Sequence, residues 1–437
     1  MKQTRKQFLK TIAIGSVGLA AGISAKSYGR ILGANDRLNF AVVGLRSRAY
    51  AHLAGIKSVP NTNITHIADV DSRELEKFSN GVNKKFGTTP IKEKDFRKIL
   101  ESKDVDIVTI ASPDHWHATM AIMALQAGKH VFVEKPCSHN PHEGEMIIAA
   151  QKKFGKVVQM GNQHRSAELA IEAMNRIHGG LIGDTYFGKA WYTNNRKSIG
   201  VGKPAPVPDY LDWDLWQGPA PRVPYKDNIH PYNWHWFFRW GTGESLNNGT
   251  HEVDLCRWAL NVGYPDSVTS TGGRYHDKDD WEFYDTLVTN FKYKDKMISW
   301  DGLCCNDKKY YGRSRGIAVY GTKGVVILDR QGYEVYDLED HKLEERTVQD
   351  KNTTKDLQSI DSMTDAHFRN FVNAIQNGEK LHSPIEEGNV AVTMLHLSNI
   401  SWRVGRTLNL NNSDGHILND AEAMHLWKRQ YEKGWEL

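Results

Sequence analysis

The sequence has few cysteines, no basic patch and no second long apolar run. These absences argue against a zinc protein, a nucleic-acid-binding protein and a membrane-spanning protein, respectively. The four cysteines lack the spacing of zinc ligands, and adjacent Cys304 and Cys305 are poorly placed to bridge each other. We expect mostly buried thiols and no metal site. A net charge of only +4 predicts no nucleic-acid surface. The mean hydropathy of −0.56, with no second apolar run, argues against a membrane-spanning protein.

The length and composition predict a soluble globular protein. A chain of 437 residues that is 40% hydrophobic and 25% charged can bury a large core. Its length favours about two domains and an additional segment. We find no internal repeat.

The additional segment is an expected export signal at residues 1–25. It combines a charged start, an apolar run at 12–23 and the small residues Ser24 and Ala25. Residues 4–10 also resemble a twin-arginine signal, with Lys6 in place of the second arginine. The ordinary secretory route and a buried first helix stay open as alternatives. We predict a periplasmic protein with a linker at 26–36, near neutral once the signal is removed.

Residues 37–160 predict a Rossmann domain that binds a dinucleotide. A strand at 38–44 ends in Gly44, and a helix follows within 45–53. The fingerprint G-x-G-x-x-G has only its first glycine here, followed by Leu45, Arg46 and Ser47. Arg46 blocks close approach of the backbone and could contact the pyrophosphate through its guanidinium.

The second strand of this domain, at 63–69, ends in an acid. Asp69 lies 25 residues beyond Gly44, where a carboxylate can bind the adenosine ribose and repel a 2′-phosphate. This position favours NAD over NADP. Alternatively, Asp69 and Asp71 cap the helix that starts near residue 72.

Three further strands, at 105–111, 131–133 and 157–161, have polar residues directly after them. Carboxyl ends of parallel strands meet at one sheet edge, where ligands bind. The last two strands present Lys135 to a substrate, Glu134 to a nucleotide hydroxyl, and Asn162, Gln163 and His164 to the cleft. An ordinary strand end with solvated charges is the alternative for Glu134 and Lys135.

Residues 161–437 predict an α+β domain with an open, mainly antiparallel sheet. We expect its strands at 186–193, 267–275, 286–293, 296–303, 316–320 and 324–328. Helical periodicity at 362–377, 387–404 and 420–433 predicts three final helices that pack back on the core. Residues 194–230 are rich in proline and aromatics and predict a long surface excursion.

Together these motifs resemble the Gfo/Idh/MocA oxidoreductases over residues 37–437. The resemblance rests on residues 44–49, Asp69, residues 112–117, Glu134-Lys135-Pro136 and a histidine motif at 233–254. It implies an N-terminal NAD(P)-binding Rossmann domain, a C-terminal wall of a sugar-binding cleft, and homo-oligomers. The residues implied at the cofactor are Gly44, Leu45, Arg46, Ser47, Asp69, Ser112, Pro113, Trp116, His117, Glu134, Lys135, Asn162 and Gln163.

The histidine motif departs from its relatives at one position. Relatives have an acid four residues before the histidine, on the same helix face, whereas Asn247 precedes His251 here. An amide can orient a substrate hydroxyl but cannot relay a proton, which puts a simple Asp-His dehydrogenase mechanism in doubt. His251 could also be an ordinary core histidine.

We assign His251 as candidate general base and Lys135 as its electrostatic partner, or as the base if its pKa is lowered. His235 and His164 are second candidates. Trp234, Trp236, Trp240 and Arg239 could form a sugar platform together with Asn247, although core packing explains tryptophans equally well.

A nicotinamide enzyme outside the cytoplasm cannot easily recycle a cofactor that diffuses away, so we expect tightly held NAD. One compatible chemistry oxidises one sugar and reduces a second carbonyl compound, similar to glucose-fructose oxidoreductase. Another cleaves a glycoside by transient C3 oxidation, elimination and hydration, and the missing acid favours this one. A non-catalytic NAD-holding sugar sensor is the third hypothesis. In each case the expected partner is a small sugar or glycoside.

Overall fold

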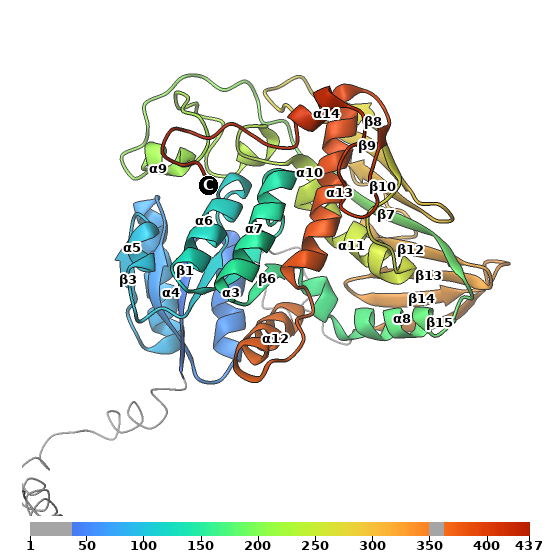
Figure 1. Cartoon of the computed structure of the whole chain (residues 1–437), viewed down its shortest axis with the longest axis horizontal. Coiled ribbons are helices and arrows are strands. Elements are labelled where there is room, and N and C mark those ends of the chain that lie inside the picture. The colour runs from blue at the N-terminus through green and yellow to red at the C-terminus, as the bar shows by residue number, and fades with distance from the viewer. Residues whose placement is uncertain (1–36, 349–361) are drawn as a thin grey trace, which may run out of the picture. The chain divides into compact units, whose positions relative to one another are not determined.

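The computed structural model describes residues 37–348 and 362–437 (Figure 1). The predicted export signal at 1–25 and the linker at 26–36 lie outside these residues. Within the described ranges, every helix is too short or too polar to cross a membrane.

A six-stranded parallel sheet forms the first half of the fold, in the order β3-β2-β1-β4-β5-β6. Its strands β4 and β6 are buried along their whole length because helices cover both faces. The bounds are β1 Leu38–Val43, β2 Thr62–Ala68, β3 Ile91–Glu93, β4 Ile107–Ile110, β5 His130–Glu134 and β6 Val158–Gly161. Strand order reverses between β1 and β4, where doubly wound sheets bind ligands.

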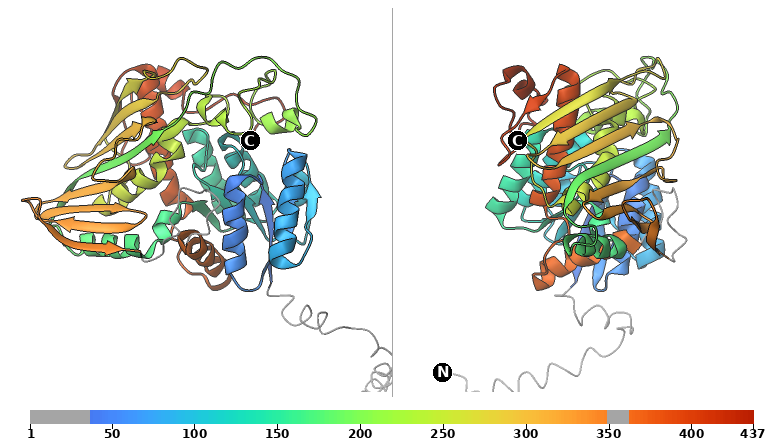
Figure 2. Two further views of the ribbon diagram at one scale, coloured as in Figure 1. Left: turned by 180° about the vertical axis from the view of Figure 1, so that it is seen from behind. Right: turned by 90° about the vertical axis from the view of Figure 1, so that its right-hand side faces the viewer.

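Helices lie on both sides of this sheet. Helices α6 (Asp114–Gln126) and α7 (Pro141–Phe154) cover the face seen in Figure 1. Helices α3 (Ser47–Ser58) and α4 (Ser72–Phe86) cover the opposite face, seen from behind in Figure 2. The short helix α5 (Arg97–Leu100) precedes β4.

A larger sheet of ten strands forms the second half, in the order β15-β14-β13-β12-β7-β10-β9-β8-β16, with β11 paired to β7. All pairs are antiparallel except β7 with β10. The bounds are β7 Thr185–Asn195, β8 Ser267–Gly273, β9 Thr286–Lys292, β10 Met297–Leu303, β11 Cys305–Asn306, β12 Arg315–Gly321, β13 Gly324–Asp329, β14 Gly332–Tyr336, β15 Lys342–Thr347 and β16 Leu408–Asn409. The predicted fold class, a Rossmann domain followed by a mainly antiparallel open sheet, is confirmed.

Helices α11 (Gly249–Leu260) and α13 (Ile385–Val404) pack on this sheet, at β7 and β8 respectively. Helix α12 (Ser362–Asn377) packs on α3, and its Phe368 also stacks on Phe132 of β5 with ring centroids 4.4 Å apart. The remaining helices are η1 Gln163–Ser166, α8 Glu168–His178, α9 Trp213–Gln217, η2 Asn233–Trp236, α10 Gly243–Asn247 and α14 Ala421–His425.

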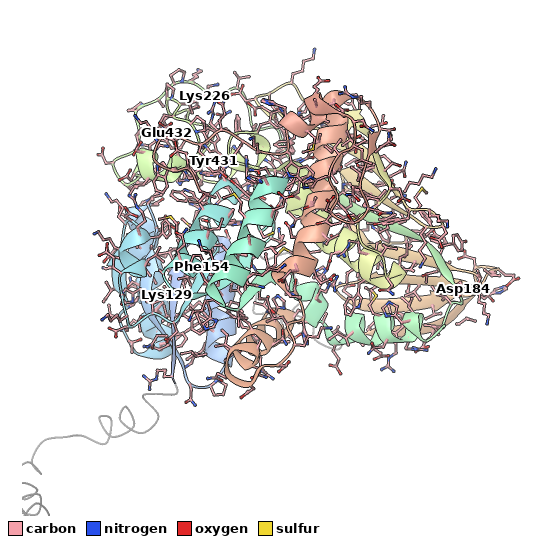
Figure 3. All side chains as sticks on the ribbon, in the orientation of Figure 1. Lys129, Phe154, Asp184, Lys226, Tyr431 and Glu432 are labelled. Carbon is pink, nitrogen blue, oxygen red and sulfur yellow. The ribbon has the colours of Figure 1, made fainter. Side chains whose placement is uncertain are left out.

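The helix predicted at 420–433 is wrong beyond α14, which ends at His425. Two of the following residues form hydrogen bonds with distant segments. The Glu432 amide donates to the Pro219 carbonyl at 3.0 Å, and the Tyr431 hydroxyl donates to Glu143 at 2.8 Å. Figure 3 shows both side chains at the end of α6 and α7, near the loop of Lys226.

The excursion predicted at 194–230 forms a separate hydrophobic cluster together with residues 234–240. Trp213 and Trp216 stack with centroids 4.7 Å apart and pack with Trp240. Trp116 Nε1, at the start of α6, donates to the Trp216 carbonyl at 3.0 Å and so connects this cluster to the first sheet's helices.

Candidate functional site

A cavity of about 830 Å³ lies at the carboxyl ends of the first sheet. One wall is formed by the loops after β1, β2, β4 and β5, and the other by β7, β12 and the junction of α10 with α11. Pockets of about 300–1,000 Å³ hold small ligands and cofactors. The cavity therefore has the size and position of a combined cofactor and substrate site.

Gly44 shapes the first end of this cavity. Its φ of +79° favours glycine, and a Cβ there would lie 2.6 Å from the Ser112 backbone nitrogen. The loops after β1 and β4 can therefore pass in close contact. Helix α3 begins directly after Arg46, and its first amides can bind an anion. Leu45, Arg46 and Ser47 also line the cavity.

Asp69 lines the cavity beside this turn. Its carboxylate accepts hydrogen bonds from the amides of Leu45, at 2.6 Å, and Asp71, at 2.9 Å. Burial raises the pKa of Asp69 to about 6. Helix α4 is capped by Asp71, which accepts from the Arg73 amide at 3.0 Å. The capping role considered for both acids thus falls to Asp71, and Asp69 faces the cavity.

Most of the other predicted cofactor residues also line the cavity: Ser112, Pro113, Trp116, His117, Glu134, Lys135 and Gln163. Gln163 Oε1 is buried and has no hydrogen-bond partner among the described residues, so it is available to a ligand. Both ring nitrogens of His117 already contact carbonyl oxygens, those of Pro136 at 2.6 Å and Ser112 at 2.8 Å. His117 therefore braces two loops.

Glu134, predicted to bind a nucleotide hydroxyl, is already engaged by two side chains. Its Oε1 contacts Arg48 Nε at 2.6 Å and His52 Nε2 at 2.9 Å. Burial opposes ionisation, yet Arg48 and His52 hold the pKa of Glu134 well below its usual range. Glu134 is thus a fixed negative charge directly before Lys135.

Lys135 and two histidines occupy the second end of the cavity. Lys135 Nζ donates to the backbone oxygen of Asn247. Burial lowers the pKa of Lys135, against the opposing charges of Glu134 and Asp114. Burial, with His164 and Lys135 nearby, lowers the pKa of His251 well below its usual value. The imidazole is therefore neutral, and one of its ring nitrogens has a free lone pair.

His251 is held from behind by buried side chains. Its Nδ1 lies 2.6 Å from Asn162 Oδ1, and Asn162 Nδ2 donates to Asp254 at 2.6 Å. Arg165 forms two hydrogen bonds with Asp254, at 2.6 and 2.8 Å. Asn162, predicted to bind the cofactor, thus lies behind the cavity wall.

His164 also lies behind the wall, outside the cavity lining. Its ring stacks on that of His251 with centroids 4.3 Å apart. Its Nε2 accepts from Arg330 Nε at 3.0 Å. His164 therefore supports His251 and does not present a free base to a substrate.

His235 lines the cavity beside Trp234, with ring centroids 3.6 Å apart. Its Nδ1 donates to the Tyr232 carbonyl at 2.7 Å, which leaves Nε2 without a proton. Burial lowers the pKa of His235 to about 3.

The predicted aromatic platform is mostly core. Trp234 lines the cavity, but Trp236 stacks on buried Trp281 and Trp240 packs in the cluster of the excursion. Arg239 is exposed, lies outside the cavity lining and donates to the Pro221 carbonyl at 3.0 Å. Arg239 was predicted to contact a substrate, but it is not among the residues that line the cavity.

Asn247 and His251 lie on two helices instead of one. Helix α10 ends at Asn247 and α11 begins at Gly249, yet both side chains line the cavity. Asn247 Nδ2 lies 3.5 Å from Glu244.

Sequence analysis missed several residues of the lining. Asp114 follows β4 within the motif at 112–117, so its place after a strand could have marked it as a lining residue. Burial raises the pKa of Asp114. Tyr192 on β7 and Arg315 on β12 come from the second sheet, and no local motif marks them. Arg315 Nε donates to Glu252 at 2.7 Å.

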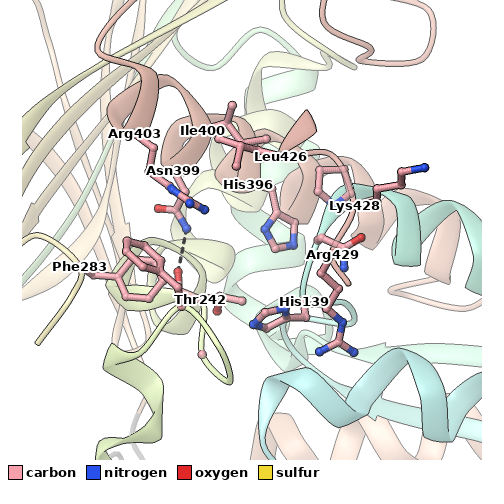
Figure 4. Close-up of a pocket in the computed structure, with 14 residues that line it drawn as sticks. His139, Thr242, Phe283, His396, Asn399, Ile400, Arg403, Leu426, Lys428 and Arg429 are labelled. Atoms are coloured by element: carbon pink, nitrogen blue, oxygen red, sulfur yellow. Dashed lines mark hydrogen bonds between the residues drawn. The ribbon is translucent and has the colours of Figure 1, made fainter. Parts of the chain in front are cut away.

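A second cavity of about 130 Å³ lies between α13, the C-terminal segment and the loop before α7 (Figure 4). His139, His396 and Arg429 line it, and Asn399 Nδ2 donates to the Thr242 carbonyl at 2.8 Å at its edge. It shares no lining residue with the larger cavity.

The parallel sheet, the Gly44 turn and Asp69 define a dinucleotide-binding protein of the Rossmann type. A domain model described as "Oxidoreductase family, NAD-binding Rossmann fold" matches residues 38–162, and the GFO/IDH/MocA C-terminal domain matches residues 170–327. The chain belongs to the GFO/IDH/MocA oxidoreductase family.

Two curated relatives are glycosidases by name. The chain is 26% identical over 216 residues to a glycosyl hydrolase family 109 protein of Saccharopolyspora erythraea, covering 45% of this chain and 47% of the relative. It is 26% identical over 220 residues to an alpha-N-acetylgalactosaminidase of Tannerella forsythia, covering 46% and 47%. The alignments thus span about half the length of these relatives.

The fold is also similar to that of an aldose-aldose oxidoreductase from Caulobacter crescentus, crystallised with glycerol. The TM-score is 0.64 at 18% identity, over 86% of this chain and 100% of the other.

Proposed function

We propose that the protein is an exported sugar-active enzyme that holds NAD tightly and cleaves glycosides by transient oxidation, elimination and hydration. One observation is central. Lys135, His251 and His235 line the same cavity as the Gly44 turn and Asp69. The names of the two curated relatives support glycosides as substrates.

The residues present fit a dinucleotide. Gly44 allows close passage of two loops, α3 offers free amides, and Gln163 Oε1 has no partner among the described residues. Asp69 would bind ribose hydroxyls and repel a 2′-phosphate, which favours NAD over NADP. Bound NAD would supply a temporary oxidation, accepting a hydride from a sugar carbon and later returning it.

His251 and Lys135 serve the oxidation step. Oxidation of a carbinol carbon requires loss of its hydroxyl proton to a base within hydrogen-bond reach. Neutral His251 accepts this proton, while the Lys135 ammonium stabilises the developing alkoxide. Asn247 orients a substrate hydroxyl between them.

Cleavage then follows from the acidity of the keto sugar. A ketone at C3 acidifies the C2 proton, and the proposed base for its removal is His235, which lines the same cavity. The C1–O bond breaks, the aglycone leaves with a proton, and water adds a hydroxyl to C1 and a proton to C2. The net reaction is hydrolysis without net redox change, so no second substrate is needed to recycle the cofactor.

A sugar–sugar oxidoreductase is the second candidate, and the likeness to the aldose-aldose oxidoreductase fold favours it. A non-catalytic NAD-holding sugar sensor is the third, because Asn247 cannot relay a proton.

The test uses protein purified without added nucleotide, incubated in heavy water with α- and β-aryl glycosides and analysed by mass spectrometry. Release of the aglycone with deuterium at sugar C2 is the expected result. Accumulation of a keto sugar or lactone with reduced nicotinamide would contradict cleavage and favour the oxidoreductase. Intact glycosides that bind with nicotinamide unchanged would favour the sensor.

A further inference from the structure

We propose that Asn162 is the positioning residue for His251, by fixing the imidazole with its proton on Nδ1 and a free lone pair on Nε2. The catalytic meaning of this arrangement rests on the proposed function, in which His251 is the base. The arrangement itself follows from donors and acceptors.

The orientation of the Asn162 amide is set by Asp254. Both residues are completely buried, and the Asp254 carboxylate is paired with Arg165 and, at 3.2 Å, with Arg257. An ionised carboxylate only accepts hydrogen bonds, so the Asn162 atom 2.6 Å away must be the amide nitrogen.

The oxygen of the same amide then determines the tautomer of His251. Asn162 Oδ1 only accepts, so the imidazole Nδ1 at 2.6 Å must carry the proton. A neutral imidazole then has no proton on Nε2. Among the described residues Nε2 has no hydrogen-bond partner, and the ring lines the cavity. His251 is thereby oriented as a proton acceptor toward a bound ligand.

A neutral amide differs from an acid in its effect on the imidazole. A carboxylate beside Nδ1 would stabilise imidazolium and raise the pKa of His251. After burial, the largest effects on the pKa of His251 come from His164, Lys135, Arg315 and Arg330, and each of these groups lowers it. Asn162 thus fixes the tautomer of His251 without placing a negative charge beside the ring. The charged carboxylate of Asp254 contacts Asn162 and not His251.

The stack with His164 completes the arrangement. Because Arg330 donates to His164 Nε2, that imidazole also has its proton on Nδ1. The two rings lie 20° from parallel, which limits rotation of His251 about its side-chain bonds.

The first experiment reads the tautomer without any turnover. Protein with 15N-labelled histidine is examined by NMR, and the His251 signals are identified by their loss in His251→Gln. We expect a protonated Nδ1 and an unprotonated Nε2, and a mixture of tautomers in Asn162→Leu. Exposed Asn175→Leu, on α8, is the matched control. A protonated Nε2 in the native protein, or an unchanged tautomer in Asn162→Leu, would overturn the proposal.

The second experiment exchanges the amide at position 162 with the carboxylate at position 254. The double variant Asn162→Asp with Asp254→Asn keeps the pair but places the carboxylate beside His251. We expect the acid limb of the kcat/KM profile to move up by about one to three pH units, the effect of an adjacent opposite charge. The His251 signals should titrate over the same higher range in NMR, even if the protein releases no aglycone.

Unchanged titration of His251 in a folded double variant would contradict the role of Asn162. Loss of the native near-ultraviolet circular dichroism identifies an unfolded variant, and the tautomer of the native protein then decides the question alone. Absence of glycoside turnover with the expected tautomer would contradict only the proposed function.

Discussion

The two ends of the large cavity are built in different ways. The cofactor end consists of consecutive loops of one parallel sheet, and its form depends on backbone geometry at Gly44 and on Asp69 directly after β2. The proposed catalytic end combines residues that are far apart in sequence: Asn162 and His251 share a buried hydrogen bond, and Arg315 bonds to Glu252. The first end is a property of local motifs, and the second is a property of the tertiary structure.

The strongest test of the cofactor end is Gly44→Ala. We expect loss of most bound nucleotide, because the new Cβ would lie 2.6 Å from the Ser112 backbone nitrogen and φ is +79°. Nucleotide released by denaturation is quantified by its absorbance. Gly87→Ala is the matched control, since Gly87 has φ +69° but no atom within 4 Å of a Cβ. If Gly87→Ala lost as much nucleotide, backbone strain alone would explain the result.

The catalytic end is tested by Lys135→Met. We expect turnover to fall by roughly 10²–10⁴-fold, the usual contribution of a positioned acid–base or electrostatic group. Bound nucleotide should stay, because Gly44, Asp69 and Gln163 are unchanged. Exposed Lys152→Met on α7 is the control. Comparable loss of nucleotide and turnover in Lys135→Met would show that the two ends are not separable.

Cofactor preference is tested by Asp69→Ala. We expect the preference for NAD over NADP to fall by about tenfold, because repulsion of the 2′-phosphate is removed. Asp71→Ala should leave the preference unchanged while lowering the free energy of unfolding by about 1 kcal/mol, since it removes the cap of α4. Binding isotherms for both nucleotides measure the first effect and denaturant titration the second. An unchanged preference in Asp69→Ala would remove the argument for NAD.

The smallest expected effect is that of Arg239→Ala. Arg239 is exposed and lies outside the cavity lining, so kcat/KM should change less than about twofold and stability by less than about 0.5 kcal/mol. Trp234→Ala, on the cavity wall, should weaken substrate binding. An equal loss in both variants would place the substrate farther out than the cavity described.

Most residues that sequence analysis assigned to the cofactor line the large cavity, because each β–α loop brings its residues to the same sheet edge. It placed both Asn162 and Gln163 at that edge, but only Gln163 lines the cavity. The direction of adjacent side chains after a strand depends on the turn that follows, here the 3₁₀ helix η1. Arg315 was missed because the β7–β12 pairing that carries it to the cavity has no local signal.

The lack of a local signal also explains two errors in the second part of the fold: β15 was not predicted, and the helix after α14 was predicted too long. Strand β15 is charged and largely exposed, so it lacks the alternating apolar pattern that predicts a strand. The segment after α14 has some helical periodicity, but Glu432 and Tyr431 form long-range hydrogen bonds that a local pattern does not reveal.

Helix α13 has a consequence for the lifetime of a bound cofactor. It is buried along most of its length, and Asn389 lies so close to α7 that a Cβ on Gly144 would be 1.9 Å from its side-chain oxygen. On its other side Ser398 lies 2.7 Å from Thr289 of β9. The helix therefore fastens the parallel sheet's helices to the antiparallel sheet, and hinge opening would break both sets of contacts. If NAD is recycled within each turnover as proposed, this connection opposes loss of the dinucleotide by separation of the two sheets.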